Sequence, residues 1–237
     1  MHLTCGILRH FQAVFWLRVF PAPNIIHARL VVEPVETHKP LTQTVLQLIQ
    51  GRIMTMRYIA FLRAINVGGH TVKMEYLRQL FESFGFSDVE TFIASGNVVF
   101  QMTAKDTSML EFKIESGLRN ALGFEVATFI RTDAELAQIA AYQAFPRSEL
   151  DAAVAFNIAF LAGPLDQKAK QKLIALTTEI DRFVVHKSEI YWLCAKKQSE
   201  STFSNAVLEK IIGGKSTIRG VNTINKMAAR YASQHAH

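Results

Sequence analysis

The chain has 237 residues, of which 49% are hydrophobic and 19% charged, so it can bury a substantial core and extensive disorder is not expected. Its formal charge is +6, but half of this excess falls in residues 1–55, and the remainder is a weak electrostatic footprint for nucleic-acid binding. The two cysteines, Cys5 and Cys194, imply no disulfide framework and favour a reducing, cytoplasmic location. The few body histidines and the lack of a paired cysteine motif predict no metal site.

Residues 1–55 differ in composition from the rest of the chain. Their longest apolar stretch, Phe11–Phe20, is interrupted by polar residues and is too short to span a bilayer. A targeting segment, a helix on a membrane surface and an upstream extension with a misassigned start are the alternatives. We prefer the extension, because Met54 and Met56 lie just before the first convincing strand, and we expect no membrane association.

Residues 56–132 are predicted to form a first structural unit. A mostly apolar strand over 57–65 is broken by the polar, glycine-containing segment 66–70. A helix follows from Met74, because apolar residues recur there at helical spacing, and Gly85 is a natural left-handed stop. The rest of this unit is predicted to contain, in order, strand 89–94, a hairpin turn at Ser95-Gly96-Asn97, strand 98–102, a helix capped by Thr107 or Ser108, and strand 126–131.

Residues 133–237 are predicted to repeat this order. Each half then reads β-α-β-β-α-β, which is the ferredoxin-like arrangement. The predicted fold class is therefore α+β with two tandem ferredoxin-like units, and it rests on element order because sequence identity between the halves is not evident. The predicted elements of the second unit are helix 134–141, strand 154–161, helix 166–176, strands 182–186 and 190–195 across Lys187-Ser188-Glu189, helix 204–212, strand 216–219 and a last helix from Asn222.

Several segments of the body resemble the domain of unknown function 1697 family, namely Leu62–Gly69, Lys73–Met74, Leu77–Arg78, Gly85–Phe86, Ser95–Phe100 and Thr217–Thr223. The resemblance covers roughly residues 56–230 and implies an α+β fold with ferredoxin-like units. The family has no settled activity, so the resemblance implies no mechanism and no cofactor. The chain departs from the family at Ala64, where Gly is common, and at Gly220, which replaces the first Asn of the pattern Thr-x-Arg-Asn-x-Asn-Thr.

The segment Asn66–His70 leaves a strand and enters a helix, which makes it a candidate anion site. Gly68 and Gly69 would allow backbone N–H groups to approach an anion in front of the helix N-terminus. Arg63 or Lys73 would add positive charge. The alternative is that the two glycines only satisfy positive φ angles in a tight connection.

Ser95 and Asn97 are candidates for ligand contacts at the same end of the sheet. The alternative is a hairpin turn and nothing more. The position on the third strand invites comparison with RNA-recognition motifs, whose stacking rings lie on that strand. Alignment on Gly96 puts Asn97 and Val99 at the ring positions, so readout by base stacking is not expected.

Arg219 and Asn222 form the last candidate cluster. They would contact an anionic ligand, or else Asn222 caps the final helix while Arg219 pairs with a carboxylate. A composite site would require loops of both halves to meet. Its members would be Arg63, Asn66, Ser95, Asn97, Arg219 and Asn222, together with the glycines at 68 and 69.

Two further motifs offer little chemistry. The segment Gly213–Thr217 ends like a phosphate-binding Walker A loop, but Glu209 stands where its first Gly should be, and the segment follows a predicted helix instead of a strand. It is better explained as a helix C-cap. His70 is the best candidate for acid–base catalysis, and Cys194 fits an inert core position on an apolar strand.

These observations lead to one preferred function and two alternatives. The preferred function is binding of a phosphorylated small molecule or nucleotide in a polar cleft. The alternatives are weak, salt-dependent nucleic-acid binding and a small enzyme of unknown reaction. The sequence leaves open whether the protein is an enzyme.

Overall fold

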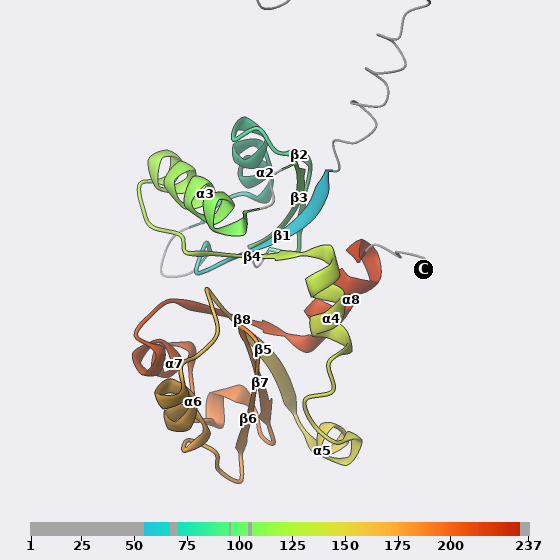
Figure 1. Cartoon of the computed structure of the whole chain (residues 1–237), viewed down its shortest axis with the longest axis vertical. Helices are drawn as coiled ribbons and strands as arrows, with labels where there is room; N and C mark the ends of the chain where they lie inside the picture. Colours follow the sequence, from blue (N-terminus) through green and yellow to red (C-terminus); the bar gives the residue numbers. More distant parts are fainter. Residues whose placement is uncertain (1–54, 67–70, 95, 104–105, 233–237) are drawn as a thin grey trace, which may run out of the picture. The chain divides into compact units, whose positions relative to one another are not determined.

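The computed structural model describes residues 55–66, 71–94, 96–103 and 106–232, which all belong to one compact unit, Ile53–His237. In this part of the chain, seven α-helices accompany eight strands, and the strands form two four-stranded antiparallel sheets (Figure 1). The architecture is therefore mixed α and β, as the sequence predicts. Gly68, Gly69, His70 and Ser95 lie outside the described residues, as do residues 1–54 of the extension.

The two halves repeat one order of elements. The first half contains β1 (Met56–Leu62), α2 (Met74–Ser83), β2 (Ser87–Phe92), β3 (Asn97–Met102), α3 (Thr107–Leu122), β4 (Thr128–Thr132) and α4 (Asp133–Ala141). After the short helix α5 (Arg147–Ala152), the second half contains β5 (Ala155–Leu161), α6 (Gln167–Ile174), β6 (Asp181–His186), β7 (Glu189–Cys194), a 3-10 turn (Gln198–Glu200), α7 (Asn205–Ile212), β8 (Ser216–Gly220) and α8 (Val221–Tyr231). The strand orders also match, β2-β3-β1-β4 in one sheet and β6-β7-β5-β8 in the other.

The alternation of side chains along each central strand explains why each sheet is buried on both faces. In β1, Tyr58, Ala60 and Leu62 join a core that also contains residues of α2 and α3. Ile59 and Phe61 point to the opposite face and join a second core. In β5, likewise, Ala159 and Leu161 pack with α6 and α7.

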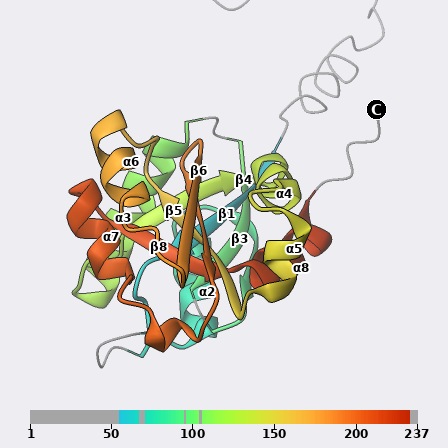
Figure 2. The ribbon, with the colours of Figure 1, turned by 90° about the horizontal axis from the view of Figure 1, so that it is seen from below.

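The second core is shared by both halves. It contains apolar side chains from both sheets and from α4 and α8, which pack against each other. In Figure 2 the strands of the second sheet lie over those of the first, and α4 and α8 stand together at one side. Its buried members are Ile59, Phe61, Val99, Phe129, Leu136, Ile139, Phe145, Ile158, Phe160, Tyr191, Leu193, Ile224, Met227 and Tyr231.

Helix ends test the local predictions directly. Asp106, and neither Thr107 nor Ser108, caps α3, because its carboxylate accepts from the N–H groups of Ser108 and Met109. Gly213 ends α7 with a φ of 66° and donates to the carbonyl of Glu209, as expected of a C-cap. Cys194 is fully buried, and desolvation raises the pKa of its thiol.

Helix α8 begins one residue earlier than predicted. Gly220 occupies the N-cap position and makes no side-chain capping bond, while Asn222 lies inside the first turn. The expectation that Asn222 caps this helix was therefore wrong. Because glycine has no side chain, the first N–H groups of α8 receive no cap from that position.

Carboxylates on the helices accept hydrogen bonds from backbone N–H groups along the outer edges of β4 and β8. Glu115 and Glu111 of α3 accept from the backbone N–H groups of Thr128 and Ile130 in β4, at 2.8 and 2.9 Å. Glu209 of α7 accepts in the same way from Ser216 of β8, at 2.9 Å. The helices thus cover the edge strands with hydrogen bonds as well as with apolar contacts.

Candidate functional site

Arg219 is a buried arginine that joins the two halves. It lies on β8, and its guanidinium donates to Asn97 Oδ1 at 2.6 Å and to the carbonyl of Leu62 at 2.8 Å, both in the first half. It also donates to Thr217 Oγ1 and to the carbonyl of Ile218 in its own strand. Desolvation lowers the pKa of Arg219 to about 10, so it remains a cation at neutral pH.

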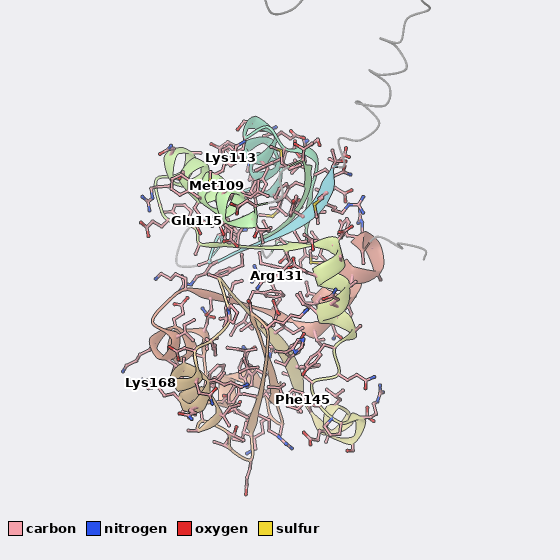
Figure 3. All side chains as sticks on the ribbon, in the orientation of Figure 1. Met109, Lys113, Glu115, Arg131, Phe145 and Lys168 are labelled. Carbon is pink, nitrogen blue, oxygen red and sulfur yellow. The ribbon has the colours of Figure 1, made fainter. Side chains whose placement is uncertain are left out.

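Arg131 makes the corresponding connection from β4. Its guanidinium donates to Glu189 Oε1 at 2.7 Å and to the carbonyl of Leu161 at 2.9 Å, both in the second half. It donates as well to the carbonyl of Ile130 in its own strand. Figure 3 labels Arg131 where the two halves meet.

The two arginines flank a stacked pair of aromatic rings. Phe61 of β1 and Phe160 of β5 stack with their ring centroids 4.0 Å apart. Arg219 lies over the ring of Phe61 and Arg131 over that of Phe160, at 6.0 and 5.7 Å. The junction is thus built from a central ring pair with one buried cation on each side.

The two polar partners of these arginines occupy equivalent positions. Asn97 begins β3 and pairs with Phe61, whereas Glu189 begins β7 and pairs with Phe160. Both side chains are buried, although the sequence patterns had placed both residues in turns. Glu189 is a residue that sequence reasoning missed, and only the strand register would have revealed it.

Arg63 makes a third connection between the halves. Its guanidinium forms a bidentate ion pair with Glu209 of α7, at 2.5 and 2.7 Å. Burial raises the pKa of the Glu209 carboxyl, but hydrogen bonds from Arg63 and Ser216 outweigh this, and the net pKa is lowered. Glu209 therefore holds both the edge of β8 and the loop after β1.

The predicted composite site is distributed over several places. Asn66 accepts from Val72 N at 2.7 Å and donates to the carbonyl of Ala94, so it holds the loop beside α2. Asn97 and Arg219 are in direct contact. Arg63 pairs with Glu209 instead of facing them, and among the described contacts none links the exposed Asn222 to this group.

An open hollow of about 420 Å³ lies beside the start of α2. Its lining comes from the start of α2, with Thr71, Val72, Lys73 and Tyr76, and from the end of α3, with Ala121, Leu122 and Phe124. Lys73 is the N-cap residue of α2 and makes no side-chain capping bond. The hollow thus combines a helix N-terminus, a lysine and an apolar wall next to the predicted loop.

A second cavity, of about 220 Å³, lies where α3, α4 and the turn between β6 and β7 meet. Glu111, Glu135, Glu189, Arg131 and Lys187 are among its lining residues. Desolvation raises the pKa of Glu111, and this outweighs the opposing effects of the Ile130 N–H and of the Arg131 charge. These residues come from segments far apart in the sequence, which is why no local motif indicated them.

The comparisons with known proteins agree with the resemblance seen in the sequence. Residues 55–191, more than half of the chain, match the family described as Protein of unknown function (DUF1697). The chain belongs to this family. No curated protein matches the sequence significantly.

A solved structure shows a similar fold. It is that of conserved bacterial protein SP0830 from Streptococcus pneumoniae, which is 22% identical to this DUF1697 protein, with a TM-score of 0.62. The match covers 74% of this chain and 98% of that one. At this identity the likeness concerns the fold alone.

Neither a metal-binding cluster nor a membrane-spanning helix occurs in the described part of the DUF1697 chain. There, no group of three or more His, Cys, Asp or Glu side chains is arranged to hold a metal ion. None of the helices described is long and apolar enough to cross a bilayer. The lining residues given above make the hollow beside α2 and the cavity beneath α3 the two candidate sites.

Proposed function

We propose that the protein binds a phosphorylated small molecule, of which a nucleotide is one example, in the hollow beside α2. The observation that carries this proposal is the meeting of Lys73, Thr71 and the uncapped start of α2 on one wall of a 420 Å³ hollow. A phosphate group there would accept hydrogen bonds from Thr71 and from first-turn N–H groups, and it would pair with Lys73.

The remaining lining residues, at the end of α3 and at Tyr76, suit the rest of such a ligand. Leu122 and Phe124 are partly buried apolar side chains at the end of α3, and Tyr76 is 43% exposed. An exposed tyrosine ring offers a stacking surface for a nucleobase or another planar group. The proposal therefore assigns the phosphate to Thr71, Lys73 and the first N–H groups of α2, and the planar group to Tyr76.

The sequence offered Arg63 and Arg219 as groups that contact an anionic ligand. Both hold the two halves together through described contacts, so the proposal does not use them as ligand groups. Asn66 supports the site indirectly, because it fixes Val72 and with it the entry to α2.

The test is titration of the full chain with adenosine monophosphate and with ribose 5-phosphate, followed by NMR or calorimetry. Lys73→Ala is expected to weaken binding at least tenfold, whereas the matched control Lys168→Ala, on an exposed part of α6 in the other half (Figure 3), should leave it unchanged. Equal affinity of both variants would overturn the proposal. Binding of an oligonucleotide alone, with strong salt dependence, would favour the nucleic-acid alternative.

We also infer that the two halves are tandem ferredoxin-like units related by duplication, with the boundary between α4 and α5 instead of at residue 132. Matching strand orders and the equivalent contacts of Arg131 and Arg219 support this. The inference predicts that the halves superpose element by element, with α4 and α8 at equivalent places. A structural superposition in which β1–β4 does not overlie β5–β8 would contradict it.

A further inference from the structure

Strand β6 forms one border of the second sheet, with β7 as its neighbour (Figure 1). The ladder between β6 and β7 is regular along the whole length of both strands. Ala195, just after β7, donates its N–H to the carbonyl of Ile180, just before β6, and such bonded pairs recur at every second residue of an antiparallel ladder. The backbone N–H and C=O groups of Phe183 and Val185 therefore point away from β7.

These outward groups lie at an open part of the border. Neither Phe183 nor Val185 makes an outward backbone hydrogen bond with a residue that the structure describes. Thr178 occupies the border earlier, at Asp181, where it accepts from the backbone N–H and donates to the carbonyl. Val184 and Val185 are partly exposed, so the centre of β6 is accessible to another strand.

The other three border strands are protected against such pairing. Carboxylates of the helices engage N–H groups on β4 and at the start of β8. Strand β2 carries Asp88 and Glu90, and its register with β3 shifts between Ser87 and Glu90. Charges and irregular pairing of this kind are common protections of edge strands. The centre of β6, Phe183–Val185, is apolar and regular and has neither protection.

The surroundings of β6 are basic. Helix α6 packs against β6 and contains three exposed lysines and no acidic residue, and none of these lysines forms an ion pair with a described residue. Asp181 is buried, and Glu149 pairs with Arg182, whereas Glu179 and Glu200 are exposed near the start of the strand. A negatively charged partner complements this surface, but a second copy would bring the same lysines into opposition.

We propose that the edge of β6 binds an extended acidic segment of a partner protein, which adds antiparallel to β6 as a further strand of the second sheet. Phe183 and Val185 each exchange backbone hydrogen bonds with the residue opposite. Phe183 packs in the core beneath α6, and opposed residues share a face, so carboxylates opposite Phe183 and Val185 meet the lysines of α6. An apolar residue opposite Val184 lies on the other face.

This surface lies on the second half of the chain and shares no residue with the hollow beside α2. The proposal therefore does not depend on the function proposed for that hollow.

The test uses the hexapeptide acetyl-Glu-Val-Glu-Val-Glu-Val-amide, titrated into the full chain and followed by NMR. Saturable binding is expected with a dissociation constant on the order of 100 μM, with shifts centred on the amides of Phe183 and Val185. The matched peptide with Lys in place of Glu should bind at least about tenfold more weakly. Equal affinity for the two peptides, or no saturation by the acidic one, would overturn the proposal.

N-methylation of the peptide tests the strand pairing without any change to the protein. Opposite Phe183 and Val185 the peptide places its Glu residues, so their N–H groups are the ones that bond to β6. N-methylation of the Glu residues should therefore abolish binding, whereas N-methylation of the Val residues should leave most of it. The reverse pattern, or equal binding of the two methylated peptides, would contradict the proposal.

Two pairs of variants locate the peptide on the protein. Val185→Pro removes an outward N–H that the ladder with β7 does not use, so it should abolish binding, whereas Val185→Thr keeps the N–H and should retain it. Replacement of Lys170 and Lys172 by Gln should weaken binding at least about fivefold, and their replacement by Arg should not. Dimerisation of the chain that Val185→Pro abolishes, without peptide binding, would refute the proposal in favour of a second copy.

Discussion

Arg131 and Arg219 are each the fourth residue of the strand that closes a sheet, and each donates to the carbonyl of the residue that ends the first strand of the other half. They differ in their polar side-chain partner. Arg131 meets the carboxylate of Glu189, whereas Arg219 meets the amide of Asn97. The two connections therefore have the same geometry but different charge.

Because of this difference, we expect removal of the two arginines to lower the free energy of unfolding by unequal amounts. Arg131→Met leaves Glu189 as a buried carboxylate without its cation, so it should lower the free energy of unfolding by about 3–5 kcal/mol. Arg219→Met leaves neutral acceptors such as Asn97 Oδ1 and should cost less, about 1–3 kcal/mol. Urea denaturation measures both, and Arg147→Met, whose side chain is 86% exposed, should stay within about 0.5 kcal/mol of wild type. A larger loss for Arg219→Met than for Arg131→Met would contradict this reasoning.

The lowered pKa of Glu209 predicts a pH-dependent contribution to stability. Because the carboxyl has a lower pKa in the folded than in the unfolded state, its contribution is complete above the ordinary pKa of about 4.3 and is lost as the pH falls through the folded value. The stability gap between wild type and Glu209→Gln should therefore be larger at pH 6 than at pH 3, as measured by urea denaturation. A gap that widens on acidification would show that Arg63 does not stabilise the ionised carboxylate.

The backbone conformation of Ala64 predicts a stabilising substitution. It has a φ of 57°, in the left-handed region that side chains disfavour. Ala64→Gly should raise the free energy of unfolding by up to about 1 kcal/mol, since relief of strain exceeds the entropy cost of glycine. The equivalent residue Gly163 has no left-handed φ and open space around its side, so Gly163→Ala should also stabilise, by about 0.4–1 kcal/mol. A drop in melting temperature for Ala64→Gly would be inconsistent with strain at this position.

The missing cap of α8 leads to a second stabilising change. Gly220 has extended backbone angles, a φ of −64° and a ψ of 140°, and Thr132, which caps α4, makes a complete capping box there. A Cβ at position 220 would lie 3.9 Å from its nearest neighbour, Asn157 Oδ1, which is ordinary contact. Gly220→Asn should therefore stabilise by a few tenths to about 1 kcal/mol, which thermal melting would detect. Gly220→Ala, which has no capping oxygen, is the control and should bring no such gain.

Local patterns in the sequence were sufficient to predict the order of the elements. Apolar residues at helical spacing gave α2 and α3, and short apolar runs gave the strands, because these signals lie within a few residues of one another. The short helix α5 was missed, since its six residues carry no apolar stripe. Strand ends were displaced by one to three residues. Where the displaced end is the start of β3 or β7, a polar residue at the start of a buried strand resembles a turn.

No local sequence pattern could predict the two cavities or the contacts between the halves. Glu189 follows a lysine and a serine and so has the appearance of a turn residue, yet its pairing with Phe160 places it beside Arg131. Arg219 and Asn97 were predicted to belong together, and they are joined by a hydrogen bond although 122 positions separate them. What the sequence did not indicate is that this contact connects two sheets.

The acidic side chains along β4 and β8 have a consequence for association between chains. An exposed edge strand presents unpaired N–H groups that another chain can extend by adding a strand. Here Glu115 and Glu111 occupy the outward N–H groups of Thr128 and Ile130, and Glu209 occupies that of Ser216. These N–H groups are not available for strand addition, so a growing sheet could not use them to extend from β4 or from the start of β8.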